Sequence, residues 1–174
     1  PPRHSHTMLE PPRDLTLSDT RCVVNAHSAF DAARALIDDG ATVNCKGPDT
    51  PPLFRLSTSW EKSAVDAVKF LVDAGADVDN GGGSVCAMAP LHRACENGNE
   101  TMVRALIEAG ANIEKTTTLG ETPLMYAAKR HSVRAVEVLL ERGAAKDTKD
   151  RDGKSARDHA RSRGPHAEIE ELLT

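Results

Sequence analysis

Residues 89–114 read APLHRACENGNETMVRALIEAGANIE and contain two short helical patterns followed by a hairpin-like exit. Leu91, Ala94 and Cys95 form a first apolar stripe at helical spacing. The second stripe has the same period and consists of Met102, Val103, Leu106 and Ile107. Pro90 suits the first position of a helix, and Gly110 tolerates the positive φ at which a helix ends. The stretch therefore predicts two short helices joined by a turn at residues 97–99.

The same pattern recurs along the chain at a nearly fixed period. Gly-Ala pairs begin at Gly40, Gly75, Gly110 and Gly143, so the spacings are 35, 35 and 33 residues. Residues 122–128 (TPLMYAA) precede a second stripe at 133–143, and residues 50–53 (TPPL) precede one at 65–75. The combination of TPLxxAA with ExGA resembles the motifs of the ankyrin-repeat family, and the resemblance covers about residues 18–174.

The resemblance implies an all-α solenoid of about five stacked helix-turn-helix units with hairpin-like finger loops. We expect a Pro-rich tail or linker at residues 1–14 and a repeat domain at 15–174. The expected repeats span residues 15–47, 48–82, 83–115, 116–148 and 149–174. The first and last copies are degenerate, as in Arg157 where the other copies have leucine, which is typical of end caps with a polar outer face.

Composition narrows the classes of function. The net charge is −4, so a large polyanion such as nucleic acid is not a favoured partner. The four cysteines have neither CxxC nor zinc-finger spacing, which favours reduced thiols and an intracellular location, cytoplasmic or nuclear. No apolar run is long enough for a membrane span, and no signal peptide is visible. The first residue is proline and not methionine, so we expect a fragment of a larger chain; the other expectation is a monomer.

Motifs for catalysis are missing from the sequence. It contains no GxSxG, HExxH or GxGxxG, so we expect no enzyme activity, no cofactor and no metal. The resemblance implies that His92 ties neighbouring repeats together, although Ala89 replaces the threonine that normally shares this network. His27, His131, His159 and His166 have no evident partner in the sequence, and residues 146–154 (KDTKDRDGK) are expected to be solvent-exposed.

The positions that the motif leaves free are the candidate site. Aligning the repeats on Pro90 brings equivalent residues of the first helices to one concave face. The candidate partner-binding residues are Arg55, Ser59, Arg93, Glu96, Asn97, Tyr126, Lys129 and Arg130. The leading hypothesis is a non-catalytic protein–protein interaction module that binds a protein partner through this face and the finger loops. The alternative is a groove for a small anionic ligand, or an unusual catalytic groove, lined by Arg55, Arg93, Tyr126, Lys129 and Arg130. A closed pocket would favour the alternative over an open groove.

Three further features carry their own expectations. Trp60 lies beside three extra residues between two predicted helices, and we prefer a lid over the helix ends to an exposed anchor for a partner. The run at Gly81–Gly83 is interpreted as a flexible fingertip, because no Lys-Ser/Thr pair follows as a phosphate-binding loop requires. The resemblance also implies that Asn44, in a finger loop, is a possible hydroxylation target.

Overall fold

Four consecutive helix pairs make up the part of the chain that this computed structural model describes, which is residues 34, 43–44, 51–83, 86–164 and 166–174. The pairs are α2 (Pro52–Leu56) with α3 (Lys62–Asp73), α4 (Pro90–Asn97) with α5 (Glu100–Glu108), α6 (Pro123–Lys129) with α7 (Val133–Glu141), and α8 (Ala156–Arg161) with α9 (Ala167–Leu172). The tail at 1–14 and almost all of the first predicted repeat lie outside the described residues, so these predictions are not tested.

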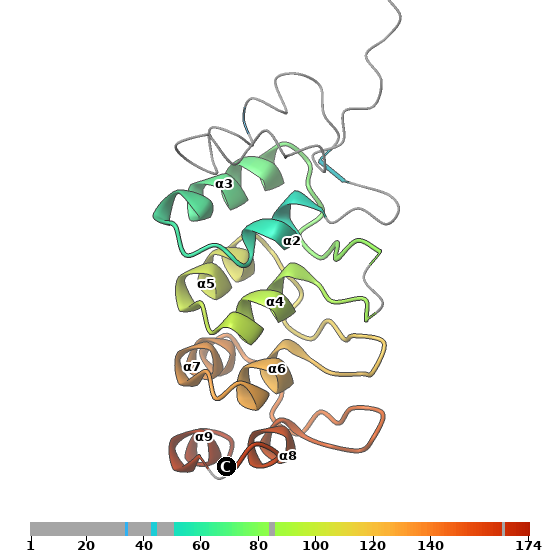
Figure 1. Ribbon diagram of the computed structural model, residues 1–174, viewed down its shortest axis with the longest axis vertical. Helices are drawn as coiled ribbons and strands as arrows, with labels where there is room; N and C mark the ends of the chain where they lie inside the picture. Colours follow the sequence, from blue (N-terminus) through green and yellow to red (C-terminus); the bar gives the residue numbers. More distant parts are fainter. Residues whose placement is uncertain (1–33, 35–42, 45–50, 84–85, 165) are drawn as a thin grey trace, which may run out of the picture.

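The helix pairs stack along one direction (Figure 1). The first helices of the pairs form one column, the second helices form another, and the finger loops project from the side of the first helices. The predicted all-α stack of helix pairs is confirmed, since the described residues contain no strand. Within these residues, none of the helices has both the length and the apolar character needed to cross a membrane.

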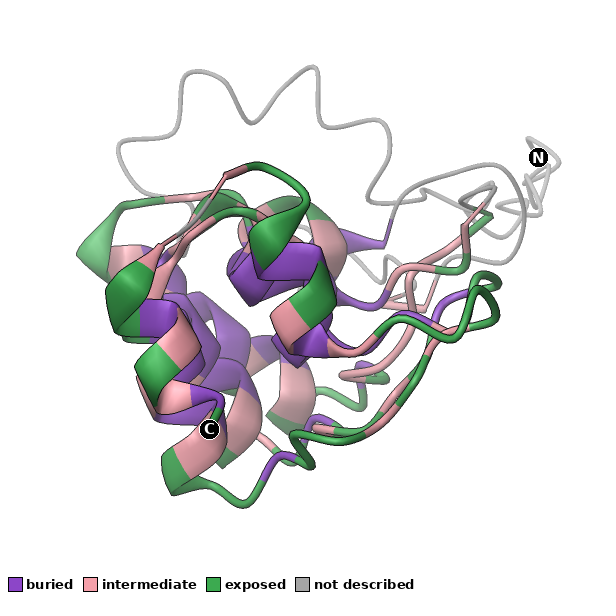
Figure 2. Cartoon of the chain, turned by 90° about the horizontal axis from the view of Figure 1, so that it is seen from below, coloured by how far each residue is buried: buried purple, intermediate pink, exposed green. Residues whose placement is uncertain are grey.

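The buried residues lie where the two columns of helices face each other (Figure 2), and most of them are small or aliphatic. Leu91, Ala94 and Cys95 are fully buried, as are most residues of the second predicted stripe, whereas Ile107 is only half-buried. Alanine at many contact positions lets short helices approach closely, so the core needs few aromatic rings. Cys95 acts as a small apolar residue, and its burial raises the pKa of its thiol.

The second helices α3, α5 and α7 end in the same way, and this ending explains the Gly-Ala pairs. Gly75, Gly110 and Gly143 have φ of +90°, +93° and +88°, a region that disfavours side chains, although a Cβ would meet no atom within 4 Å. The alanine that follows donates its N–H back to the helix, as in Ala111 N–H to the Leu106 carbonyl at 3.0 Å. Glycine is therefore required here by backbone conformation and not by space.

Each finger loop is linked to the next by one side chain, and two of these junctions also have a backbone hydrogen bond at 3.0 Å, from the Thr118 N–H to the Cys86 carbonyl and from the Arg151 N–H to the Leu119 carbonyl. Asn44 accepts a hydrogen bond from the Asp77 N–H at 2.8 Å, and its amide donates to the Gly75 carbonyl at 2.8 Å. The equivalent Asp79 accepts from the Asn112 N–H at 3.1 Å, one repeat further on. Glu114 has the same role in the next repeat, where its carboxylate accepts a hydrogen bond from the Ala145 N–H at 2.9 Å. The hydroxylation of Asn44 stays a prediction.

Two structural details differ from the interpretation of the sequence or refine it. A Cβ at Gly81 would lie 1.6 Å from the Met88 carbonyl oxygen, so this glycine is packed against backbone and is more than part of a flexible tip. At the C-terminal end, the Arg157 guanidinium donates to the Glu170 carbonyl at 3.3 Å, which satisfies part of a charge that a further packed repeat would bury. Arg161 pairs with the Glu170 carboxylate at 2.8 Å beside it.

Candidate functional site

The exposed side of the first helices carries most of the predicted site residues. Arg55 lies on α2, Arg93 and Glu96 lie on α4, and Lys129 and Arg130 lie at the end of α6. We call this surface, defined by these five residues, the first-helix face. Three consecutive repeats contribute to it because the same helix positions come into register in the stack.

An ion network joins two repeats on this face. The Arg93 guanidinium contacts the Glu96 carboxylate at 2.9 Å, and Arg130 from the next repeat contacts the other Glu96 oxygen at 2.7 Å. Burial by itself would raise the pKa of Glu96, but hydrogen bonds and charge from Arg130, and then from Arg93, outweigh it and hold the pKa below its usual range. Glu96 therefore remains ionised and fixes both guanidinium groups.

Arg55 and Arg93 line an open hollow of about 350 Å³ together with Phe54 and Thr58. The Arg93 guanidinium lies 5.9 Å from the centre of the Phe54 ring, within the range of a cation–π contact. The hollow is open to solvent and is not an enclosed pocket. The guanidinium groups of Arg55 and Arg93 can therefore donate hydrogen bonds to a partner that lies across the first helices.

Tyr126 does not lie on the exposed surface, and the prediction that it does is wrong. Tyr126 is only 9% exposed, and its ring packs against that of His92 in a T-shaped arrangement with 5.4 Å between the ring centroids. Burial, together with the nearby Glu121 carboxylate, raises the pKa of its phenol. The ring turns inward because the imidazole of His92, in the neighbouring repeat, packs against it. The Lys129 ammonium lies 5.8 Å from the centre of the Tyr126 ring.

His92 has the structural role that the resemblance implies, despite the missing threonine. Its Nδ1 accepts the Ala89 N–H at 3.1 Å, and its Nε2 contacts the Glu121 carbonyl of the next repeat at 3.2 Å. Because Nδ1 is an acceptor, the neutral ring carries its proton on Nε2 and donates it to that carbonyl. Burial lowers the pKa of His92, in agreement with a neutral ring. In the next repeat, the Thr122 hydroxyl also accepts the Met125 N–H.

Ser59 and Asn97 lie away from the ion network. Ser59 follows α2, and its carbonyl accepts a hydrogen bond from the Asn99 side chain at 2.7 Å. Asn97 is the last residue of α4 and is exposed. Ser59 lines a second hollow, of about 410 Å³, formed along the turns between the helices of each pair. The structure therefore divides the predicted site into the first-helix face and this turn region.

Trp60 also belongs to the turn region, and the preferred expectation of a lid is wrong. Its side chain is one of two large exposed apolar side chains among the described residues, with 69% of the residue accessible. The extra residues lengthen the turn, so α3 begins only at Lys62 and the indole extends outward beside the hollow. An exposed tryptophan fits the alternative role, an anchor for a partner, which stays a prediction.

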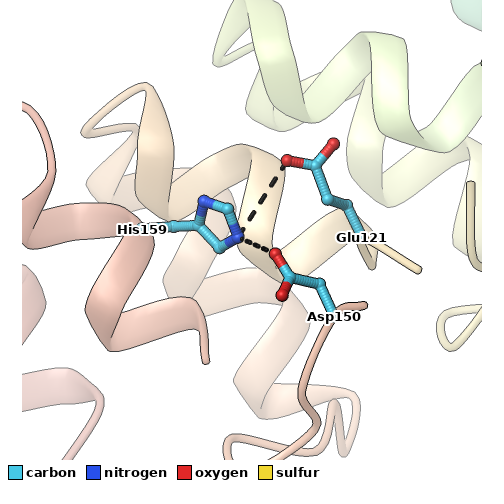
Figure 3. A group of neighbouring side chains, drawn as sticks. All are labelled: Glu121, Asp150 and His159. Atoms are coloured by element: carbon cyan, nitrogen blue, oxygen red, sulfur yellow. Dashed lines mark hydrogen bonds and ion pairs between the residues drawn. The ribbon is translucent and has the colours of Figure 1, made fainter. Parts of the chain in front are cut away.

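A buried polar cluster forms where two finger loops meet α8 (Figure 3). The His159 Nε2 lies 2.7 Å from an Asp150 oxygen and 4.0 Å from a Glu121 oxygen. The His159 side chain is 8% exposed, and the side chains of Asp150 and Glu121 are each 5% exposed. The sequence interpretation missed this cluster, since His159 was given no partner and Asp150 was placed in a solvent-exposed loop. The sequence did hold a signal for His159, because this residue aligns in the repeats with Arg93 and Tyr126, which were predicted site residues.

His131 also has a partner that the sequence interpretation did not identify. Its Nε2 lies 2.9 Å from the Ala160 carbonyl oxygen of the following repeat. His131 sits in the turn between α6 and α7 with φ of +56°, so this contact holds a backbone conformation that few non-glycine residues adopt. It is a structural tie between repeats, as His92 is.

Comparisons with known proteins agree with this architecture. A family model described as ankyrin repeats, in three copies, matches residues 58–152, more than half of the chain. The comparison with curated proteins finds no match. The matched segment begins just after α2 and ends in the finger loop before α8, so it covers α3 to α7 and all residues of the first-helix face except Arg55. The motif, the stacked helix pairs and the family match together show that this chain belongs to the ankyrin-repeat family.

Proposed function

We propose that this chain is a non-catalytic interaction module that holds a protein partner against its first-helix face and finger loops. Ankyrin repeats are generally protein–protein interaction modules and are typically non-catalytic. The stack supports this use because equivalent positions of successive repeats form one continuous surface. The guanidinium and ammonium groups on that surface can bind a polypeptide without any chemical reaction.

The observation that carries the proposal is the separation of charges by depth on the first-helix face. The side chains of Arg93, Lys129 and Arg130 are 40%, 38% and 41% exposed. Their carboxylate partners lie beneath them, with Glu96 at 19% and Glu121 at 5% exposure. The outermost charges are therefore positive, although the whole chain has a net charge of −4. A partner approaching this face meets guanidinium and ammonium groups first.

The chemistry of this face favours a partner segment that carries carboxylates. Guanidinium groups form forked, charge-assisted hydrogen bonds with carboxylates, and arginine is enriched among the residues that dominate binding energy. Glu96 already orients Arg93 and Arg130, so less side-chain entropy is lost when a partner binds. We infer that the partner presents aspartate or glutamate side chains in an extended or helical segment.

The alternative of a small anionic ligand has less support. The hollow beside Arg55 and Arg93 is open to solvent, whereas a small molecule needs a site that encloses most of its surface. An open surface suits a polypeptide, whose binding energy is distributed along its length.

The experiment compares two pairs of arginine substitutions. Peptides are selected from a displayed random library on the wild-type protein, and their affinities are measured by fluorescence anisotropy. Arg55→Ala with Arg93→Ala is expected to weaken binding at least about tenfold, as loss of interface arginines usually does. Arg104→Ala with Arg142→Ala is the matched control, since it removes the same charge from the column of second helices.

The results separate the possibilities clearly. Loss of binding only in the Arg55 and Arg93 variant, with unchanged circular dichroism, supports the proposal. Equal losses in both variants show a general charge effect, and no loss in either places the site elsewhere. A selection that enriches no peptide on the wild-type protein also contradicts the proposal. Raised salt is expected to weaken the selected complexes, because the face is exposed.

A further inference from the structure

We propose that Glu121, Asp150 and His159 form a binding site for a divalent transition-metal ion, with zinc as the ion that the donor set suits best. One imidazole and two carboxylates converge from two finger loops and α8 (Figure 3). One ligand atom from each residue lies within 4.8 Å of the other two. Metal binding here does not depend on the proposed partner-binding role, although Lys129, which contacts Glu121, also belongs to the first-helix face.

The distances are close to those that a metal ion requires. Ligand atoms on a tetrahedral zinc ion with bonds of about 2.0 Å lie about 3.3 Å apart. The His159 Nε2 is 2.7 Å from an Asp150 oxygen and 4.0 Å from a Glu121 oxygen. Side-chain shifts of less than about 1 Å would equalise these distances around an ion. The cluster borders a hollow of about 260 Å³, which leaves room for a water ligand in the fourth position.

The charge balance of the cluster also favours a cation. Both carboxylates are 95% buried, and in the described part of the chain the cationic groups within 4 Å of them are Lys129 and, when protonated, His159. With a neutral imidazole, the two carboxylates and Lys129 leave one negative charge in a buried position, which is costly. For the ion to bind, the Nε2 of His159 must first release the proton that it donates to Asp150 at 2.7 Å, so that the neutral ring carries its proton on Nδ1. A divalent ion that also displaces Lys129 would then bring the sum of the buried charges to zero.

The surrounding groups already orient the ligands. One Asp150 oxygen accepts the backbone N–H groups of Asp152 and Lys154, each at 2.9 Å, and this leaves the other oxygen directed at His159. Glu121 is held through its backbone, which exchanges hydrogen bonds with Thr117. Such outer contacts raise metal affinity because the ligands need little reorganisation. An adventitious group of surface carboxylates would lack this support.

Lys129 is the built-in competitor for the ion. Its ammonium lies 3.1 Å from the Glu121 oxygen that would coordinate the metal. Its side chain is 38% exposed, so it can turn toward solvent when an ion arrives. The donor set determines which ions compete successfully, because imidazole suits zinc and similar transition metals, whereas magnesium and calcium prefer oxygen ligands alone.

The test is a titration of the chelator-stripped full chain with zinc chloride, followed by isothermal calorimetry in a buffer that does not bind metals. We expect one zinc ion per chain at this site. His159→Gln is expected to weaken its binding at least about 100-fold, since even outer contacts contribute 10- to 100-fold. Asp150→Asn and Glu121→Gln should weaken it as well. Lys129→Met should tighten it about 3- to 10-fold by removing the competing ion pair.

Two control variants test whether histidines outside the cluster bind the ion. His4→Gln with His6→Gln removes the histidines of the N-terminal segment, and His166→Gln removes another histidine of the last repeat. Both should retain the site. Loss of binding in either control, or zinc binding that His159→Gln leaves unchanged, would overturn the proposal. Magnesium at the same concentration should give no comparable heat.

The proposal remains testable if His159→Gln does not fold, which circular dichroism would reveal. Cobalt then replaces zinc in the wild-type protein, where its visible absorption bands report the coordination number. Tetrahedral or five-coordinate bands that strengthen in Lys129→Met support the site. An octahedral spectrum identical to that of cobalt in buffer, or an unchanged affinity in Lys129→Met, rejects it.

Discussion

Lowering the pH from 7.5 to 5.5 should destabilise this protein through one buried residue, His92. The ring is fully buried, its Nδ1 accepts the Ala89 N–H, and its Nε2 contacts the Glu121 carbonyl. A second ring proton would have to enter at Nδ1, where it would face another N–H and break the tie. Burial therefore lowers the pKa of His92 in the folded protein.

The magnitude follows from linkage between protonation and folding. The unfolded chain has the ordinary histidine pKa of about 6.5, so it takes up a proton first as the pH falls. Stability from a lowered histidine pKa is thus complete above about pH 6.5 and decreases below it. If the folded ring stays neutral to pH 5.5, the loss is about 1.4 kcal/mol, from RT ln(1 + 10).

The assay is urea unfolding of the wild-type protein and of His92→Gln at both pH values. The other titrating groups are common to both proteins, so their contributions cancel in the difference. The variant should be less stable at pH 7.5 by about 2–4 kcal/mol, because it loses buried hydrogen bonds and packing. That difference should shrink by up to about 1.4 kcal/mol at pH 5.5. A difference that does not change with pH would refute the neutral, buried ring.

Three further substitutions test the local reasoning. Ala89→Ser supplies the capping oxygen that Thr122 provides one repeat later, and should add about 0.5–1 kcal/mol of stability in urea unfolding; a loss would show that the oxygen has no room. Gly81→Ala should cost about 1–3 kcal/mol by the same measurement, since its Cβ would collide with the Met88 carbonyl, and an unchanged midpoint would contradict that packing. Trp60→Ala should change stability by less than about 0.5 kcal/mol, and efficient acrylamide quenching of the wild-type fluorescence should confirm that the indole is exposed; a loss above 2 kcal/mol would mean that it is packed.

The helices and their ends were predictable because local rules control them. Pro90 and Pro123 begin first helices as expected, and Gly75, Gly110 and Gly143 end second helices in the positive-φ region. These features depend on the backbone conformation of a few neighbouring residues. Periodicity then predicts that equivalent residues stack, and this prediction holds for the described repeats.

The chemistry of the site depends on contacts between repeats, which a single sequence does not reveal. Tyr126, Arg93 and His159 occupy equivalent positions, yet Tyr126 packs inward on His92, Arg93 pairs outward with Glu96, and His159 meets two buried carboxylates. Each outcome is decided by the side chain that the adjacent repeat places opposite. Trp60 was mispredicted for a related reason, because the path of an extended turn is not encoded in helical periodicity.

The local ties between neighbouring fingers have a mechanical consequence. The main helix contacts lie within a pair or between adjacent pairs, and Asn44, Asp79 and Glu114 each join only one finger to the next. Within the described repeats, a pulling force along the stack is therefore carried by a series of similar junctions between neighbouring repeats. The stack should behave as a soft spring that extends in steps, each the length of one released repeat.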